Sequence, residues 1–80
     1  MKYEVILAEV AQRTYDSMPP AGQQAFTTKR RRLAVAPEQE GTWSPKTHRW
    51  TTHMGPHGVI EYTVHGSVVR VVVWRIQFYG

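Results

Sequence analysis

Titratable and cationic side chains gather in the second half of the sequence. The residues whose types could do chemistry there are Arg49, His53, Glu61, Arg70, Arg75 and Tyr79. Such side chains could cleave a phosphodiester such as that of RNA, which without a metal needs a base for the 2′-hydroxyl proton, a cation for the phosphorane charge and an acid for the leaving oxygen. Glu61 or His53 is the candidate base, and Tyr79 or His53 is the candidate acid. The three arginines are candidates for holding the phosphate through forked hydrogen bonds.

Other cationic and aromatic residues are candidates for contacts to RNA. They are Trp74, which can stack on a splayed base, and Lys29, Arg30, Arg31, Arg32 and Lys46. Four consecutive residues, 29–32, cover a whole helical turn, so one of them must lie near the core. Its aliphatic side-chain carbons then pack against the core, and its charged group extends to solvent. The run suits either docking to RNA, which would be ribosomal RNA if the family resemblance given below holds, or a plain solvated helix face.

The hydrophobic pattern predicts the order strand, helix, helix, strand, strand, strand. We expect strands over 2–7, 47–54, 58–64 and 67–78, helices over 9–18 and 22–36, and a loop over 38–46. Pro19 and Pro20 separate the helices, and Pro37 ends the second. This order predicts one α+β domain over 1–80, with both helices packed on one face of a mostly antiparallel four-stranded sheet.

Two turns decide which side chains share a face of that sheet. A two-residue turn at His65-Gly66 would place Glu61 opposite Arg70, on an open face that continues to Trp74. A three-residue loop, 55–57, places Trp50 on the buried face and Arg49 with His53 on the open face. A loop of even length would bury Arg49 unpaired, which costs several kcal/mol. The facing Glu61 and Arg70 could equally form a simple cross-strand ion pair.

Composition limits the classes of function. The chain has 80 residues, no cysteine and a net charge of +4. Absence of cysteine excludes disulfides and thiolate chemistry, and the four histidines have neither the spacing nor the companion residues of a metal site, so no metal or small-molecule cofactor is expected. The positive charge favours nucleic acid or an acidic protein as a partner. No apolar run is long enough for a membrane span, which predicts a soluble, cytoplasmic protein without membrane contact.

Several segments resemble the RelE/ParE superfamily of bacterial toxins from type II toxin–antitoxin pairs. AEVAQRTYDSMPP (8–20) is similar to the family's first helix and proline turn, and LAVAPEQEG (33–41) to the end of its second helix and the loop after it. HRW (48–50) resembles its second strand, and VIEYTVHGSVVRVVVWRI (59–76) its terminal hairpin. The resemblance assigns site roles to Arg49, Arg75 and Tyr79. The chain departs from the family at two places. It has Gly58-Val59 early in the third strand, where an arginine is usual, and its nearest match to the family's terminal basic pair is Trp74-Arg75.

The resemblance implies the function of a toxin silenced by an antitoxin protein. Members of the RelE type are metal-independent endoribonucleases that cut ribosome-bound mRNA and inhibit translation, whereas members of the ParE type poison DNA gyrase. We therefore expect an mRNA interferase with RNA, the ribosome and an antitoxin as partners. The alternative is a non-catalytic toxin, either a gyrase inhibitor or a degenerate form that only binds its antitoxin. The open-face cluster favours the first, and Gly58-Val59 favours the second.

Overall fold

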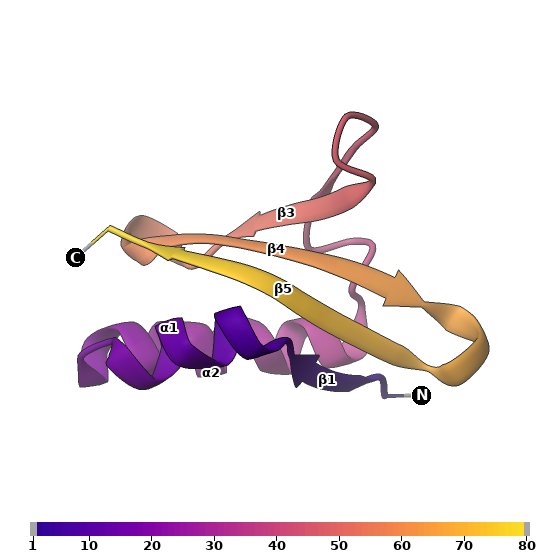
Figure 1. Ribbon diagram of the computed structural model, residues 1–80. Helices are drawn as coiled ribbons and strands as arrows, with labels where there is room; N and C mark the ends of the chain where they lie inside the picture. Colours follow the sequence, from indigo (N-terminus) through magenta and orange to yellow (C-terminus); the bar gives the residue numbers. More distant parts are fainter. Residues whose placement is uncertain (1, 80) are drawn as a thin grey trace.

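The computed structural model describes residues 2–79, which form two helices and a five-stranded sheet (Figure 1). The elements are β1 (Glu4–Leu7), α1 (Glu9–Ser17), α2 (Pro20–Val35), β2 (Thr42–Ser44), β3 (Arg49–His53), β4 (Gly58–His65) and β5 (Arg70–Phe78). The strand order is β1-β5-β4-β3-β2, with β1 parallel to β5 and the other neighbours antiparallel. Both helices lie on one face of the sheet. The predicted α+β fold is confirmed, but the expected loop over 38–46 contains β2 as a fifth strand.

Prolines set the boundary between the helices. α1 ends at Ser17, and Pro20 is the first residue of α2, two residues before the expected start. Proline is favourable at this position because its missing N–H has no partner within the helix there. Gly22 faces the sheet closely, since a Cβ on it would lie 2.7 Å from the Phe78 ring.

The core lies between the helices and the covered face of the sheet. Its fully buried larger side chains are Phe26, Leu33, Ile60, Tyr62, Val71 and Val73. Helix α2 contributes the first two of these, and alternate positions of β4 and β5 contribute the others. This alternation leaves every second side chain of the two central strands on the face that no helix covers.

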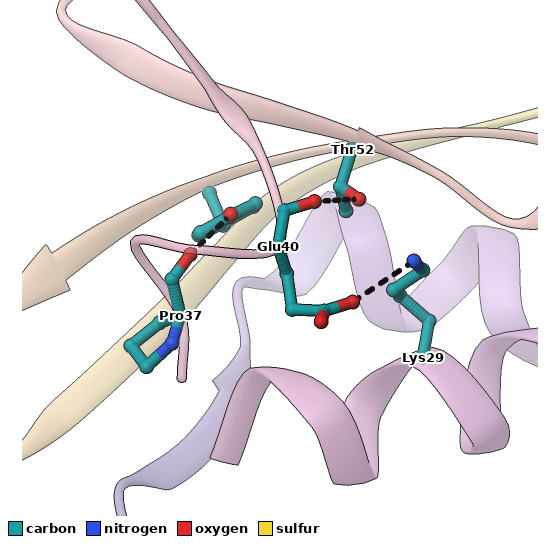
Figure 2. A network of polar contacts seen from close by, with 5 residues as sticks. Lys29, Pro37, Glu40 and Thr52 are labelled. Carbon is teal, nitrogen blue, oxygen red and sulfur yellow. Dashed lines mark hydrogen bonds and ion pairs between the residues drawn. The ribbon is translucent and has the colours of Figure 1, made fainter. Parts of the chain in front are cut away.

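The segment between α2 and β2 is tied down by polar contacts (Figure 2). The Tyr62 hydroxyl donates a hydrogen bond of 2.6 Å to the carbonyl oxygen of Pro37, and the Thr52 hydroxyl donates one of 2.7 Å to the carbonyl oxygen of Glu40. The Glu40 carboxylate accepts a hydrogen bond of 3.1 Å from Lys29 Nζ. Burial, followed by the charges of Glu40 and Glu38, raises the pKa of Tyr62 from 10.0 to about 12.

The β3–β4 connection has the predicted length. Residues 55–57 form the turn, and Trp50 pairs with Tyr62 as expected. Trp50 is half-buried against the core, while Arg49 lies on the opposite face. Gly58 begins β4 at φ 155°, and a Cβ there would lie 2.0 Å from the carbonyl oxygen of Gln77, so the turn excludes a side chain at this position.

The predicted two-residue turn between β4 and β5 is wrong. His65 pairs with Arg70, and residues 66–69 form the connection, with Val69 in the left-handed region at φ 52°. A β-branched residue adopts this conformation rarely, so the pattern of residue types gives no warning of the longer turn. The pairing therefore shifts by four residues, and Val64 faces Val71 rather than Ser67.

Candidate functional site

Most of the predicted catalytic residues lie on the face of the sheet that is turned away from both helices. Figure 1 shows both helices against the other face. We call the face without helices the open face, and in the described chain its central part consists of Arg49, Thr51 and His53 from β3, Glu61, Thr63 and His65 from β4, and Trp74 and Arg75 from β5. The opposite side chains of the same strands, such as Tyr62 and Val73, are buried. The covered face thus holds the strands rigid while the open face presents polar and aromatic groups.

A β-bulge in β5 brings two consecutive side chains onto the open face. Glu61 pairs with Arg75 and Tyr62 pairs with Val73, which leaves Trp74 as the extra residue. Trp74 and Arg75 are both exposed, whereas Val73 and Ile76 on either side of them are buried. Bulges re-aim side chains in this way, and strict alternation would have turned Arg75 toward the core.

Glu61 lies between two arginines. Arg49 Nη1 donates a hydrogen bond of 3.2 Å to Glu61 Oε1, and Arg75 Nη1 lies 4.0 Å from Glu61 Oε2. The side chain of Glu61 is 26% exposed, and those of Arg49 and Arg75 are 37% and 58% exposed. Two arginines against one carboxylate give the cluster a net positive charge, and all three groups are open to an incoming anion. The structure therefore brings together three of the predicted catalytic candidates.

A second set of contacts extends from Arg49 along the open face. The guanidinium carbon of Arg49 lies 5.6 Å from the centre of the Trp74 ring, within the range of a cation–π interaction. Trp74 Nε1 donates a hydrogen bond of 2.7 Å to Thr63 Oγ1, which is also 2.7 Å from His65 Nε2. Sequence reasoning did not single out Thr63 or His65 for the site. Once the bulge is known, their alternation with Glu61 along β4 indicates them.

Arg70 lies apart from this cluster. The longer turn moves it opposite His65, and its Nε donates a hydrogen bond of 3.1 Å to Glu4 on β1. The expected pairing of Glu61 with Arg70 is therefore wrong, and Arg75 takes that place through the bulge. Arg70 remains on the open face because the four-residue shift is an even number.

The two other predicted proton-transfer candidates lie toward the far end of β5. His53 is exposed and pairs with Val59, the neighbour of Glu61 two residues along the strand. Tyr79 follows β5, is 60% exposed, and is held by a 2.8 Å hydrogen bond from its backbone N–H to the carbonyl oxygen of His57. His53 is thus the closer of the two to the arginine cluster in strand register.

The cationic run on α2 divides into two pairs. Lys29 forms the ion pair with Glu40, and Arg30 Nη2 donates a hydrogen bond of 2.7 Å to the carbonyl oxygen of Val5 on β1. These two residues therefore have structural partners, as expected of a helix turn that partly faces the core. Arg31 and Arg32 are exposed on the helix side of the molecule, each at the lining of a separate groove.

The β2–β3 hairpin carries an aromatic cluster that sequence reasoning did not identify. Trp43 packs edge-on against Trp50, with ring centres 5.7 Å apart, and also lies against His48. Trp43 pairs with Trp50 and so belongs to the covered side of the sheet. Lys46 is exposed in the turn of this hairpin. The cluster lies on the opposite face from Trp74 and is separate from the arginine site.

Residues 2–79 contain neither a cluster of metal-ligating side chains nor a membrane-spanning helix. No group of three or more histidine, aspartate or glutamate side chains in this range could hold a metal ion. No helix of the same range is long and apolar enough to cross a membrane.

Comparison with known proteins connects the fold to one group of solved structures. A chain of the toxin–antitoxin complex RelBE2 from Mycobacterium tuberculosis aligns with a TM-score of 0.89 and 18% identity, covering 99% of this chain and 100% of that one. A chain of the archaeal RelE–RelB complex from Pyrococcus horikoshii aligns with a TM-score of 0.77 and 17% identity, covering 100% of this chain and 98% of that one. A variant of E. coli toxin RelE in the free state aligns with a TM-score of 0.79 and 15% identity, covering 98% of this chain and 84% of that one.

Sequence comparison adds no further relatives. No protein-family model matches the chain, and no curated protein matches it significantly. A YoeB/ParE toxin from Agrobacterium tumefaciens also shares the fold, with a TM-score of 0.70 and 13% identity over 96% of this chain and 99% of that one. From the order of its elements, the topology of its sheet and these alignments, the chain has the fold of the RelE/ParE superfamily of toxins.

Proposed function

We propose that this protein is the toxin of a type II toxin–antitoxin pair and that it acts as a metal-independent endoribonuclease on ribosome-bound mRNA, in the cytoplasm. The observation that carries the proposal is the cluster of Arg49, Glu61 and Arg75 on the open face of a RelE-like fold. The solved RelBE2 structure with this fold is a toxin–antitoxin complex, which supports an antitoxin as the partner.

The cluster suits an RNA phosphate. Arg49 and Arg75 flank one position at which Glu61 now supplies the negative charge. A phosphate that binds beside Glu61 receives forked hydrogen bonds from the two guanidinium groups, and the charge that develops on the phosphorane strengthens them. The arginines therefore bind the transition state more tightly than the substrate, which is the requirement for catalysis.

We assign proton transfer to Glu61 between the arginines and to His53 or Tyr79 farther along the open face. Glu61 takes the proton of the 2′-hydroxyl, whose oxygen then attacks the adjacent phosphorus. The bond from phosphorus to the 5′-oxygen breaks, and His53 or Tyr79 protonates that oxygen. The products are a 2′,3′-cyclic phosphate and a 5′-hydroxyl, so atoms and charges balance without a metal or an external reagent.

The alternative function is a toxin that binds without cutting, either a DNA gyrase inhibitor or a degenerate form that only binds its antitoxin. The observation that favours it is the start of β4, where Gly58 excludes any side chain and Val59 is apolar. No third arginine can therefore reach the phosphate from this position. The two functions differ in whether RNA is cleaved.

Primer-extension mapping of mRNA in a translating extract tests the proposal. The parent protein is expected to produce discrete cuts, and Arg75→Ala or Glu61→Gln to slow them by about 10²–10³, the size of one phosphate-stabilising or general-base contribution. Arg13→Ala is the matched control, because Arg13 is an exposed arginine on α1 that pairs with Glu9 of the same helix and lies away from the open face. His53→Ala and Tyr79→Phe identify the acid.

The outcomes separate the two functions. Cuts by the parent that survive Arg13→Ala and are lost in Arg75→Ala support the endoribonuclease. Translation that continues without cuts, together with inhibited supercoiling by DNA gyrase, supports the alternative. Equal cutting by all variants would leave an enzyme whose site is elsewhere.

A further inference from the structure

The indole of Trp74 is held in one orientation although it is exposed. Its side chain leaves the strand at the bulge, and the residue is 38% exposed. Indole Nε1–H is only a donor, so Thr63 Oγ1 accepts the 2.7 Å hydrogen bond. The same hydroxyl contacts His65 Nε2 at 2.7 Å, which restricts its rotation in turn. An exposed aromatic ring with its polar atom already bonded has only its π surface to offer a ligand.

Arg49 joins this ring to the phosphate site. Its guanidinium group contacts both Glu61 and the Trp74 ring, so the aromatic surface and the cationic cluster share one side chain. A nucleotide carries a flat base and a phosphate on a single sugar. The arrangement on the open face therefore provides an aromatic surface for a base beside a cationic position for its phosphate.

We propose that Trp74 is the nucleobase subsite of this protein, with Thr63 as the positioning residue that fixes the indole. An unpaired base of the RNA stacks on the exposed part of the ring while the adjacent phosphate binds Arg49 and Arg75. Stacking of this kind tolerates every base, because each has a π face, but it excludes a base within a duplex. The inference rests on the proposed function and adds the residue that selects unpaired RNA.

Binding of a short 2′-O-methyl RNA tests this subsite apart from catalysis. The methyl group removes the attacking hydroxyl, so the probe binds without being cut. Fluorescence anisotropy with a labelled single strand and with its duplex gives the two affinities. The parent is expected to prefer the single strand, and Trp74→Ala to weaken single-strand binding about 5- to 150-fold, which is the measured range for one stacked base.

Matched variants separate stacking from folding. Trp43→Ala removes an exposed indole from the other face of the sheet, so it is expected to bind like the parent. Thr63→Val keeps the side-chain shape but removes the acceptor of the indole N–H, and it is expected to weaken binding several-fold. Thr63→Ser restores the hydroxyl and is expected to restore the affinity, which a role in packing alone would not predict.

Failure of this inference can be distinguished from failure of the proposed function. If Trp74→Ala binds the single strand like the parent while Arg75→Ala loses affinity, the phosphate site stands and the base subsite is refuted. If Thr63→Val equals the parent, the positioning role of Thr63 is refuted. If the parent binds neither probe, and mRNA is not cut in extract, both proposals fail together.

Discussion

Replacing Tyr62 with phenylalanine tests how the loop after α2 is held to the sheet. The ring of Tyr62 is fully buried, and its hydroxyl donates a 2.6 Å hydrogen bond to the carbonyl oxygen of Pro37. Phenylalanine keeps the ring but leaves that carbonyl without this partner. The loss of the contact is expected to lower the free energy of unfolding by about 1–3 kcal/mol at neutral pH.

The same substitution has a different effect at alkaline pH. Burial and two nearby carboxylates raise the pKa of Tyr62 from 10.0 to about 12 in the folded protein. The unfolded chain therefore loses this proton first as the pH rises, so the stability that depends on it is complete below pH 10 and is lost as the pH rises toward 12. The difference between a pKa of 10.0 and one of about 12 corresponds to about 2–3 kcal/mol of folding free energy. The stability advantage of the parent over Tyr62→Phe should therefore shrink as the pH rises from 10 to 12.

Urea denaturation followed by circular dichroism at pH 7, 10 and 11.5 measures both effects. The difference between parent and variant isolates Tyr62 from the other groups that titrate in this range. Tyr79→Phe is the control, because Tyr79 is 60% exposed, and its stability should follow that of the parent at each pH. Equal stability of Tyr62→Phe and the parent at pH 7, or a difference that does not change with pH, would refute the role of this hydroxyl.

Two further predictions concern the β3–β4 turn and the partner protein. Gly58→Ala should lower the free energy of unfolding by about 2 kcal/mol or more, because its Cβ would lie 2.0 Å from the carbonyl oxygen of Gln77. Gly66→Ala is the control and should be nearly neutral in the same denaturation assay, because a Cβ at Gly66 meets nothing within 4 Å. Antitoxin binding should weaken as salt rises if an acidic segment of the partner covers this cationic chain, and a calorimetric affinity that is the same at low and high salt would exclude charge as the cause.

The faces of the sheet could be predicted from the sequence, although the pairing of its last two strands could not. The period of two along β4 placed Tyr62 in the core and Glu61 on the open face whichever partner they had. An error of four residues in the turn preserved these faces, and together with the bulge, which adds one more residue, it exchanged Arg75 for Arg70 as the partner of Glu61. Val69 in the left-handed region is the local cause, and its residue type does not reveal it.

Long-range contacts explain the rest of what sequence reasoning missed. The bulge at Trp74 depends on how two strands meet, so the apolar run in β5 contains no sign of it. The intramolecular partners of Lys29 and Arg30 were also not predicted, because Glu40 and the carbonyl oxygen of Val5 lie 11 and 25 residues away along the chain. The prolines, by contrast, act locally, and the boundary between the two helices was predicted to within a few residues.

The chemistry of the RNA ends tests the central claim most directly. If the open face cleaves RNA through the 2′-hydroxyl, the upstream fragment ends in a 2′,3′-cyclic phosphate and the downstream fragment begins with a 5′-hydroxyl. A single 2′-deoxy nucleotide placed before the cut should then abolish cleavage at that position. Downstream fragments with a 5′-phosphate, or continued cutting at the 2′-deoxy position, would show attack by water and contradict the mechanism assigned to Arg49, Glu61 and Arg75.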